Sequence, residues 1–557
     1  MTQSTTVSAQ DISTQGSRRQ WLTAARALTQ SGMLTPPGPL TLGRIINRYW
    51  QHGNTAATLF GVAAARYPNR SAIIDDSGAI TYAELYRDAG ALASHLCAQK
   101  RPKSVAIICR NHRGFFQALA ATAMTGAETI SINTELPAIQ LATLLTRHAP
   151  DALIYDEEFA DAIAAGNFGG TQVVVGGPAR TETSVPTLMS IVETSSRFRH
   201  RVWRSGKFTL LTSGTTGLAK GVPRSVRLWG VVQLAVSGTA TVPLRSRDVV
   251  VVGPPFFHGF GLLAAIGVIS AGGTVVCRSR FDAATMVDDM ARHRATVLFA
   301  VPTMLQHILD VEPSAAEKSI HLRCAVTGAA PITSVTVQRF QDRFGNVLVN
   351  GYGSTEAGVV TTATPDELRR FPSTVGKAAL GVSIRIVDEA GALVPTGNSG
   401  RIFVRGPLEY AGYTRDTRSP APTKVVIDGF VDTGDVGYVN SEGLLFLAGR
   451  SDDMIVSGGE NVFPGEVEDI LVRYPSIKDA IVVGVSDERF GQVLQAFVVT
   501  TNNEMVDPDA LKLHLRASLE RYKIPKQFIT IDAIPRNPSG KVLRSKLLEL
   551  AASGENA

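Results

Sequence analysis

A repeated alternation of strand and helix patterns constrains the fold of this chain more than any other feature. From Thr55 to Asn350, short apolar runs typical of buried strands recur between stretches that have helical periodicity. The expected strands cover residues 72–75, 105–109, 128–133, 152–155, 171–175, 208–211, 249–252, 296–300, 324–327 and 347–350. This rhythm predicts stacked α/β layers with mostly parallel strands.

The chain has 557 residues, which is too long for one hydrophobic core. After Gly376 the expected strands become shorter, at residues 382–387, 400–405 and 444–447, and Gly/Pro turns separate them. Past Arg450 a compact α+β unit follows, with helices over residues 465–474, 508–521 and 542–552 and strands over 480–485 and 493–499. We therefore predict a leader at 1–50, a large α/β domain at 51–450 with a small β-subdomain at about 376–449, and a mobile α+β C-terminal domain at 451–557.

Composition excludes several classes of protein. The net charge is only +6 and Lys/Arg-rich runs are missing, so we expect no nucleic-acid partner. The N-terminus lacks the apolar segment of a signal peptide, and the nearly uncharged stretch 259–276 is broken by Gly272 and Gly273. Four scattered cysteines without a C-x-x-C pair favour a cytoplasmic protein. Peripheral membrane contact and a homodimer remain open.

A loop rich in glycine and hydroxyl side chains follows the expected strand at 208–211. Its glycines let backbone N–H groups approach an anion, and Lys220 adds a positive charge, so the loop suits a polyphosphate. By itself it would equally fit a surface turn. The candidate nucleotide-binding residues here are Thr212, Ser213, Gly214, Thr215, Thr216, Gly217 and Lys220.

Four further segments carry groups suited to nucleotide chemistry. The turn expected at 350–356 offers Tyr352 as a flat face for a base, and it offers Thr355 and Glu356 as ligands for a phosphate oxygen and for Mg²⁺. Asp435 could hold ribose hydroxyls or only cap a turn. Residues 449–453 could form a hinge or a solvated linker, and Lys541 lies on a Pro/Gly-rich loop before the last helix. Each signal is weak alone.

Taken together and in this order, these segments resemble the adenylate-forming superfamily of acyl-CoA synthetases, luciferases and adenylation domains. The matching motifs lie at residues 212–222, 352–356, 433–435, 449–453 and 538–541, and the resemblance covers the chain from about Thr55 to Leu550. It implies that ATP activates a carboxylate to an acyl-adenylate, which is then transferred to a thiol. Positioning and electrostatics would carry such a reaction.

The resemblance also implies roles for particular residues. Lys541, Thr355 and Glu356 would be catalytic, and Glu356 and Thr215 would hold Mg²⁺. Gly328, Ala329, Ala330 and Tyr352 would enclose adenine, while Asp435 would hold the ribose and Arg450 would also contact the nucleotide. Asp452 would be the hinge about which the C-terminal domain turns. The loop of Ser457, Gly458, Gly459 and Glu460 would then frame the tunnel for the CoA thiol.

The expected substrate pocket is mostly apolar. By the same resemblance its residues are Trp229, His258, Gly259, Val301, Met304, Gly328 and Ser354. Without an acid to pair with an ammonium, this set favours a fatty or aryl acid over an amino acid.

We therefore expect a fatty acid–CoA ligase that uses ATP, Mg²⁺ and CoA on a medium- or long-chain acid. One alternative is a fatty-acyl-AMP ligase that passes the acyl group to a carrier protein, although the expected blocking insertion is not seen between Glu356 and Gly376. An aryl-acid–CoA ligase is the other close alternative. A luciferase-like oxygenase fits less well, since an aromatic emitter pocket is not evident. A non-catalytic nucleotide-binding regulator also fits less well, since Lys541 and Glu356 are both present.

Overall fold

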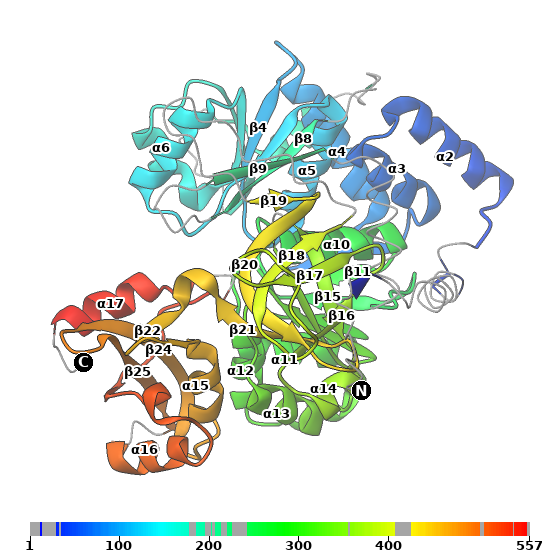
Figure 1. The fold of residues 1–557 in the computed structure, drawn as a ribbon. Helices are drawn as coiled ribbons and strands as arrows, with labels where there is room; N and C mark the ends of the chain where they lie inside the picture. The colour runs from blue at the N-terminus through cyan, green and yellow to red at the C-terminus, as the bar shows by residue number, and fades with distance from the viewer. Residues whose placement is uncertain are drawn as a thin grey trace.

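The computed structural model describes most of the chain. The described residues are 12–13, 29, 31–32, 35–177, 185–194, 202, 206–212, 220–225, 242–354, 357–406, 425–501, 506–537 and 540–553. Figure 1 shows a large domain made of two stacked α/β parts and a β-rich part, with a smaller C-terminal domain beside it. This is the expected mixed α/β fold, with a large N-terminal and a small C-terminal domain.

The first sheet has the strand order β7-β6-β4-β5-β8-β9. Its strands are β4 (Ser104–Ile108), β5 (Glu128–Ser131), β6 (Ala152–Asp156), β7 (Thr171–Gly176), β8 (Lys207–Thr212) and β9 (Lys220–Ser225). Its helices are α5 (Arg113–Thr125), α6 (Ala138–His148), α7 (Ala160–Ala165) and α8 (Leu188–Thr194). All pairs are parallel except β8–β9, which is antiparallel.

The second sheet contains the parallel order β14-β13-β12-β10-β11-β2, with β3 antiparallel at its edge. Its strands are β2 (Ser71–Asp75), β3 (Gly78–Thr81), β10 (Val249–Val252), β11 (Thr274–Val276), β12 (Val297–Phe299), β13 (Cys324–Gly328) and β14 (Leu348–Ser354). The helices of this part are α2 (Pro39–His52), α3 (Ala56–Arg66), α4 (Tyr82–Leu96), α10 (Gly259–Ala271), α11 (Ala283–Arg292), α12 (Pro302–Asp310), α13 (Ser334–Phe344) and α14 (Pro365–Arg370).

One hydrophobic core joins these two sheets. It contains residues from β4 and β6 of the first sheet, from β10 and β12 of the second, and from helices α3, α4, α5 and α10. Helix α4 begins with a capping box, in which Thr81 accepts from the Glu84 backbone and Glu84 accepts from the Thr81 N–H group. Helix α5 is apolar around most of its surface, and Phe115 and Phe116 are fully buried.

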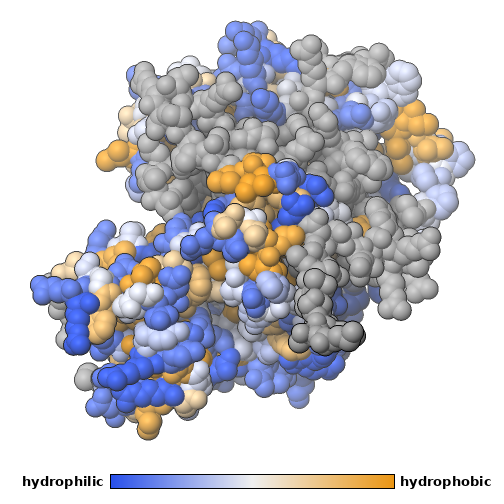
Figure 2. All heavy atoms as spheres, viewed as in Figure 1, coloured by the Kyte–Doolittle hydropathy of each residue, from blue (hydrophilic) through white to orange (hydrophobic). Residues whose placement is uncertain are grey.

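The β-subdomain continues the second sheet rather than forming a separate one. Its strands are β15 (Gly358–Ala363), β16 (Thr374–Ala378), β17 (Ser383–Val387), β18 (Gly400–Arg405), β19 (Val426–Ile427), β20 (Phe430–Val439) and β21 (Leu445–Arg450), and β1 (Ile12–Ser13) pairs with β17. Antiparallel pairing of β14 with β15 and of β15 with β16 makes the connection. Over β19, Figure 2 shows apolar residues at the surface, where Val425, Val426 and Ile427 are each about half exposed.

The C-terminal domain has its own sheet and core. The sheet contains β22 (Ile455–Ser457), β23 (Glu460–Val462), β24 (Ile477–Asp487), β25 (Gly491–Thr500) and β26 (Gln527–Thr530). Helices α15 (Pro464–Leu471), α16 (Pro508–Arg516) and α17 (Arg544–Ser553) pack on it. The short helix η3 (Ser451–Asp453) connects this domain to β21.

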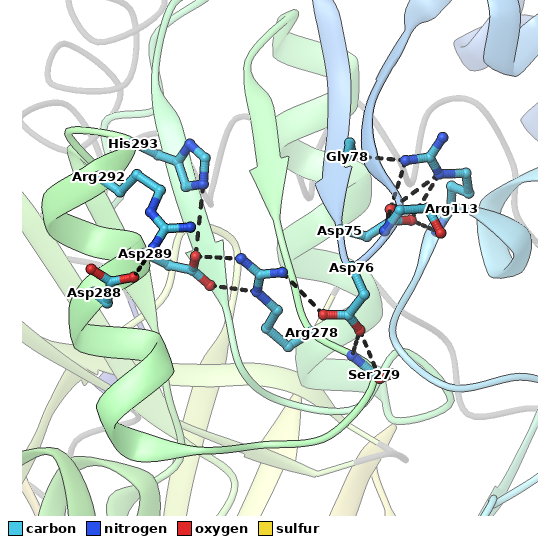
Figure 3. Close-up of polar contacts among 11 residues, drawn as sticks. Asp75, Asp76, Gly78, Arg113, Arg278, Ser279, Asp288, Asp289, Arg292 and His293 are labelled. Atoms are coloured by element: carbon cyan, nitrogen blue, oxygen red, sulfur yellow. Dashed lines mark hydrogen bonds and ion pairs between the residues drawn. The ribbon is translucent and has the colours of Figure 1, made fainter. Parts of the chain in front are cut away.

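An ion-pair network ties together elements of the two α/β parts (Figure 3). The Arg113 guanidinium at the start of α5 lies 2.6 Å from Asp75 Oδ1 at the end of β2. Arg278, which follows β11, bridges Asp289 of α11 at 2.6 Å and Asp76 at 3.0 Å. The side chains of Asp75 and Asp289 are only 1% and 2% exposed, so the network is part of the folded core.

Several sequence-based bounds differ from the structure. Helix α2 crosses the expected leader boundary at residue 50. The helix expected over 508–521 ends at Arg516, and a separate short 3₁₀ turn follows at Arg521–Lys523. The stretch 259–276 forms a buried helix and strand, as expected. In the part of the chain that the structure describes, no helix is long and apolar enough to cross a membrane.

Candidate active site

A chain of polar contacts joins three strands of the large sheet, β14, β20 and β21, and runs toward the C-terminal domain. The Tyr352 hydroxyl, in β14, donates a hydrogen bond of 2.5 Å to Asp435 Oδ2 in β20. Asp435 and Arg450 lie opposite each other in the β20–β21 pair, and their charged groups are 3.8 Å apart. Arg450 then donates to Asp452 in η3, with 2.8 Å between Nε and Oδ1. The network therefore links the candidate base and ribose residues to the expected hinge.

Two residues of this network lie within strands. Tyr352 belongs to β14, which continues through Ser354 because it pairs with β15. The turn predicted at this position was wrong, since local glycine content did not reveal the long-range antiparallel pairing. Asp435, expected just after a turn, lies in the middle of β20, opposite β21.

Burial and charge act together on these groups. Burial, followed by the neighbouring Asp435 carboxylate, raises the pKa of Tyr352 well above its usual value, so the phenol stays protonated and donates. For Asp452, partial burial raises the pKa, but the Arg450 hydrogen bond and the charges of Arg450 and Lys541 outweigh it, and the net pKa is lowered. The Asp452 carboxylate is therefore ionised at neutral pH, and the positive charge of Lys541 stabilises this ionised form.

The segment Gly328–Ala330 lies beside Tyr352. Gly328 ends β13 and pairs with Gly351 of β14, so closely that a Cβ atom on Gly328 would lie 2.6 Å from the Gly351 carbonyl oxygen. The next residue, Ala329, has a φ of 69°, which is strained for a residue with a side chain. Backbone strain of this kind concentrates at functional sites.

The turn that carries Lys541 contacts the large domain. A Cβ atom built on Gly540 would lie 3.0 Å from Thr303 Oγ1 and 3.4 Å from Val301 Cγ2, so the turn packs against the start of α12. Arg536 shapes the turn by donating to the Gly540 carbonyl at 3.2 Å while it pairs with Asp479 at 2.8 Å. The Lys541 side chain itself is exposed. The turn before this lysine therefore packs on the large domain, while the Lys541 side chain stays accessible.

The described pocket candidates gather at the ends of the second sheet. His258 directly precedes α10, which Gly259 begins, and Val301 and Met304 lie at the start of α12. Burial lowers the pKa of His258, so its imidazole is neutral at pH 7. Val301 and Met304 are 1% and 6% exposed and belong to the core, and the Met304 sulfur would lie 2.9 Å from a Cβ atom on Gly253. Large buried side chains therefore fill the space behind the strand ends.

One residue that shapes the loop before His258 was not singled out from the sequence. Asn111, which follows β4, is 6% exposed. Its amide donates to the Pro254 carbonyl at 2.9 Å and accepts from the Phe256 N–H group at 2.8 Å. It thus fixes the loop that leads to His258 from a distant part of the chain. Locally, Asn111 is only one of several polar residues that follow β4, and nothing near it in the sequence distinguishes it.

Other predicted site residues lie outside the described residues. They are Ser213, Gly214, Thr215, Thr216, Gly217, Trp229, Thr355 and Glu356. The structure does describe the backbone of Thr212 and Lys220, which face each other across the β8–β9 pair. The two ends of the candidate phosphate loop are therefore adjacent. The Mg²⁺ ligands Thr215 and Glu356 stay a prediction.

The candidate thiol-tunnel loop is a tight turn between β22 and β23. Gly458 and Gly459 have φ values of 62° and 89°, which favour glycine. The Gly458 N–H group donates to the Phe490 carbonyl at 2.9 Å. Ser457 is buried and Glu460 is exposed. A role in framing a thiol stays a prediction.

A cavity of about 500 Å³ lies elsewhere, near the end of β6. Arg110, Glu158, Arg280, His112 and Asp156 line it. These charges pair with one another: both arginines bind Glu158, and His112 lies 2.8 Å from Asp156. None of the predicted site residues lines this cavity, so we do not place the chemistry there.

Comparison with known proteins gives matches over nearly the whole chain. The model of the AMP-binding enzyme family matches residues 60–414, and the model of the AMP-binding enzyme C-terminal domain matches residues 466–541. The chain is 32% identical to a feruloyl-CoA synthase from Amycolatopsis sp, over 86% of this chain and 96% of that protein. It is 30% identical to a 2-succinylbenzoate–CoA ligase from Bacillus velezensis, over 87% and 96%. The fold superposes on the crystal structure of ATP-bound MatB from Rhodopseudomonas palustris with a TM-score of 0.78 and 29% identity, over 89% and 98%.

Proposed function

The chain belongs to the AMP-binding enzymes, and from this premise we propose that it is an ATP-dependent ligase that joins a ring-bearing carboxylic acid to CoA. In the first half-reaction the carboxylate oxygen attacks the α-phosphorus of ATP, and pyrophosphate leaves with its electron pair. In the second, the CoA thiol gives up its proton and attacks the acyl carbon, and AMP leaves. ATP and CoA are the co-substrates, and Mg²⁺ would neutralise phosphate charge.

The observation that carries this proposal is the polar network that ends at Asp452, together with the packing of the Lys541 turn on the large domain. The Tyr352–Asp435–Arg450–Asp452 contacts provide a buried phenol, two carboxylates and a guanidinium in a row. The charge of the Lys541 ammonium lowers the pKa of Asp452 at the junction of the two domains. Such fixed charges can stabilise charge that develops on phosphate oxygens, which is what adenylation requires.

Within this frame we assign roles to the described residues. Asp435 accepts hydrogen bonds from the ribose hydroxyls, and Tyr352 orients Asp435 while it lines the adenine site with Gly328–Ala330. Arg450 and Lys541 bind the nucleotide phosphate and the substrate carboxylate. Asp452 is the pivot of the C-terminal domain. These assignments rest on the contacts above and on the family to which the chain belongs.

For the acid, we favour an aromatic or otherwise cyclic carboxylate over the fatty acid expected from sequence. Two similar proteins are a feruloyl-CoA synthase and a 2-succinylbenzoate–CoA ligase, whose acids carry a ring. The nearly complete burial of Phe257, Val301 and Met304 also favours a short, flat acyl group over an extended chain, because filling side chains leave little room for a long tunnel.

A panel of acids tests the proposal. The purified chain would be incubated with ATP, Mg²⁺ and CoA and with ferulate, benzoate, 2-succinylbenzoate, octanoate or palmitate, and acyl-CoA would be measured by mass spectrometry. We expect kcat/KM to be at least about 10-fold higher for the best ring-bearing acid than for either fatty acid. Preference for octanoate or palmitate would overturn the substrate class. Absence of ATP-dependent product with every acid would overturn the ligase itself.

A further inference from the structure

The C-terminal domain is held to the large domain at a second place, away from the turn of Lys541. Asp469 lies in α15 of the C-terminal domain and reaches the first turn of α13 in the large domain. Its Oδ1 atom accepts from the Ser334 N–H group at 3.1 Å and from the Ser334 hydroxyl at 2.9 Å. Figure 1 shows α15 facing the α12–α13 side of the large domain.

The Ser334 contact is a helix cap supplied by another domain. The first N–H groups of a helix lack partners within the helix, and a negative charge is favourable there. Thr333 caps α13 by accepting from the Thr336 N–H group, while Asp469 satisfies the Ser334 N–H group and supplies the charge. The neighbouring Val335 packs against the hydrophobic core of the C-terminal domain. Polar and apolar contacts therefore coincide at this turn.

An ion pair lies on the same side. Lys478, at the start of β24, is 2.8 Å from Asp310 at the end of α12. The two side chains are 45% and 30% exposed, and Asp310 also pairs with Arg339 of the large domain at 3.2 Å. Partly exposed pairs of this kind change an equilibrium by about fivefold or less each.

We propose that Asp469 and Lys478 form a latch that holds the C-terminal domain where the Gly540–Lys541 turn meets the large domain. The inference rests on the proposed function, because only an enzyme with two half-reactions needs the domain both held and released. The latch favours adenylation by raising the population of the docked arrangement. Its contacts are few and partly exposed, so the domain can detach for thioester formation. Asp469 and Lys478 are thus positioning residues that act through Lys541.

The test separates the two half-reactions. In the Asp469→Ala/Lys478→Ala double variant, we expect ATP–pyrophosphate exchange to fall about 10-fold, since two docking contacts are lost. Thioester formation from supplied acyl-adenylate should keep its wild-type rate or rise. The Asp469→Asn/Lys478→Arg variant keeps an acceptor and a cation and should stay within about twofold of wild type. The Arg473→Ala variant removes only the partner of Asp469 that lies just past α15 in the same domain, and it is the matched control.

A distance measurement gives a readout independent of activity. Spin labels would be placed at Lys318→Cys and Leu513→Cys, one exposed position in each domain, in a background in which Cys97 is Ser. The double variant should show a several-fold larger population of undocked distances than the wild type and the control. An unchanged distance distribution, or an equal loss in both half-reactions, would overturn the latch. If the wild type fails to exchange pyrophosphate with any acid, the proposed function fails, and the distances still decide whether the latch exists.

Discussion

At the scale of single residues, the candidate site depends on polar and charged side chains that orient one another. Tyr352 has a raised pKa and donates to Asp435, and Arg450 stands between Asp435 and Asp452. Each group is therefore oriented before a nucleotide arrives. Pre-oriented charges lower the cost of reorganisation during the reaction.

Tyr352→Phe tests this orientation. The substitution keeps the ring but removes a hydrogen bond to a carboxylate, so Asp435 would be free to turn away from the ribose. We expect the KM for ATP to rise about 10-fold while kcat changes little, the size of one hydrogen bond to a charged group. Steady-state kinetics with varied ATP concentration would measure both KM and kcat. Tyr438→Phe, whose ring stacks on Phe446 in the same sheet, is the control, and an equal effect in both variants would contradict the role.

At the scale of helices and strands, sequence patterns predicted where the elements lie better than which strands pair with one another. Apolar runs such as Val249–Val252 and Cys324–Gly328 became buried parallel strands, because burial on both faces requires continuous apolar sequence. The sequence nominated Tyr352 and Asp435 as candidate site residues, but it placed Tyr352 in a turn and Asp435 just after one. Their strands exist through pairing with β15 and β21, which no local window contains.

Asn111 is a residue that the sequence could not nominate, because its contacts are also long-range. Its role depends on the Pro254–Phe256 loop, which is far away in sequence, so composition and spacing around Asn111 carry no sign of it. Lys541 differs from Asn111, because it lies in a short local motif. Its expected catalytic role came from the resemblance of the whole chain to the adenylate-forming superfamily. The candidate site residues that the sequence could nominate were those that lie in a short motif of neighbouring positions.

Asn111→Ala tests how much the loop before α10 depends on this contact. The change leaves the Phe256 N–H group and the Pro254 carbonyl without their side-chain partner in a buried place, which should cost about 1 to 3 kcal/mol of unfolding free energy. The KM for the acid should also rise, since His258 follows directly. Chemical denaturation and kinetics would measure both effects. The exposed Asn346→Ala should change stability by less than about 0.5 kcal/mol, and equal stability of the two variants would refute the prediction.

At the scale of the whole molecule, two ion-paired carboxylates, the buried Asp75 and the exposed Asp76, make stability depend on pH. Burial raises the pKa of Asp75, but the hydrogen bonds and charge of Arg113 outweigh it, so the folded-state pKa lies below the ordinary value of 3.8. The pKa of Asp76 is lowered in the same way by Ser279 and Arg278, against burial. Their stabilisation is therefore present above pH 3.8 and is lost as the pH falls through the lower folded-state values.

Acid unfolding measures this contribution. We expect the unfolding free energy to fall as the pH is lowered from about 5 to about 3. Asp75→Asn should cost about 3 kcal/mol at neutral pH, because Arg113 would lose its buried partner. The variant should also show a flatter pH dependence in this range. A pH profile identical to that of the wild type would show that Asp75 does not titrate as described.

The two-domain arrangement is the feature on which the functional account depends. The C-terminal domain has its own core, joins the large domain at η3, and contacts it through Gly540 and Asp469. A domain built in this way can bring one cation to a site made by another domain. Lys541 is that cation in our account.

The most direct measurement is ATP–pyrophosphate exchange by Lys541→Ala, with Lys546→Ala in the following helix as the control. We predict that exchange slows by roughly 10² to 10³-fold in Lys541→Ala, the scale of losing one charge-stabilising donor, while the control keeps the wild-type rate. Thioester formation from supplied acyl-adenylate should persist in both variants. Near-normal exchange by Lys541→Ala would contradict the central claim that the C-terminal domain delivers the adenylating cation.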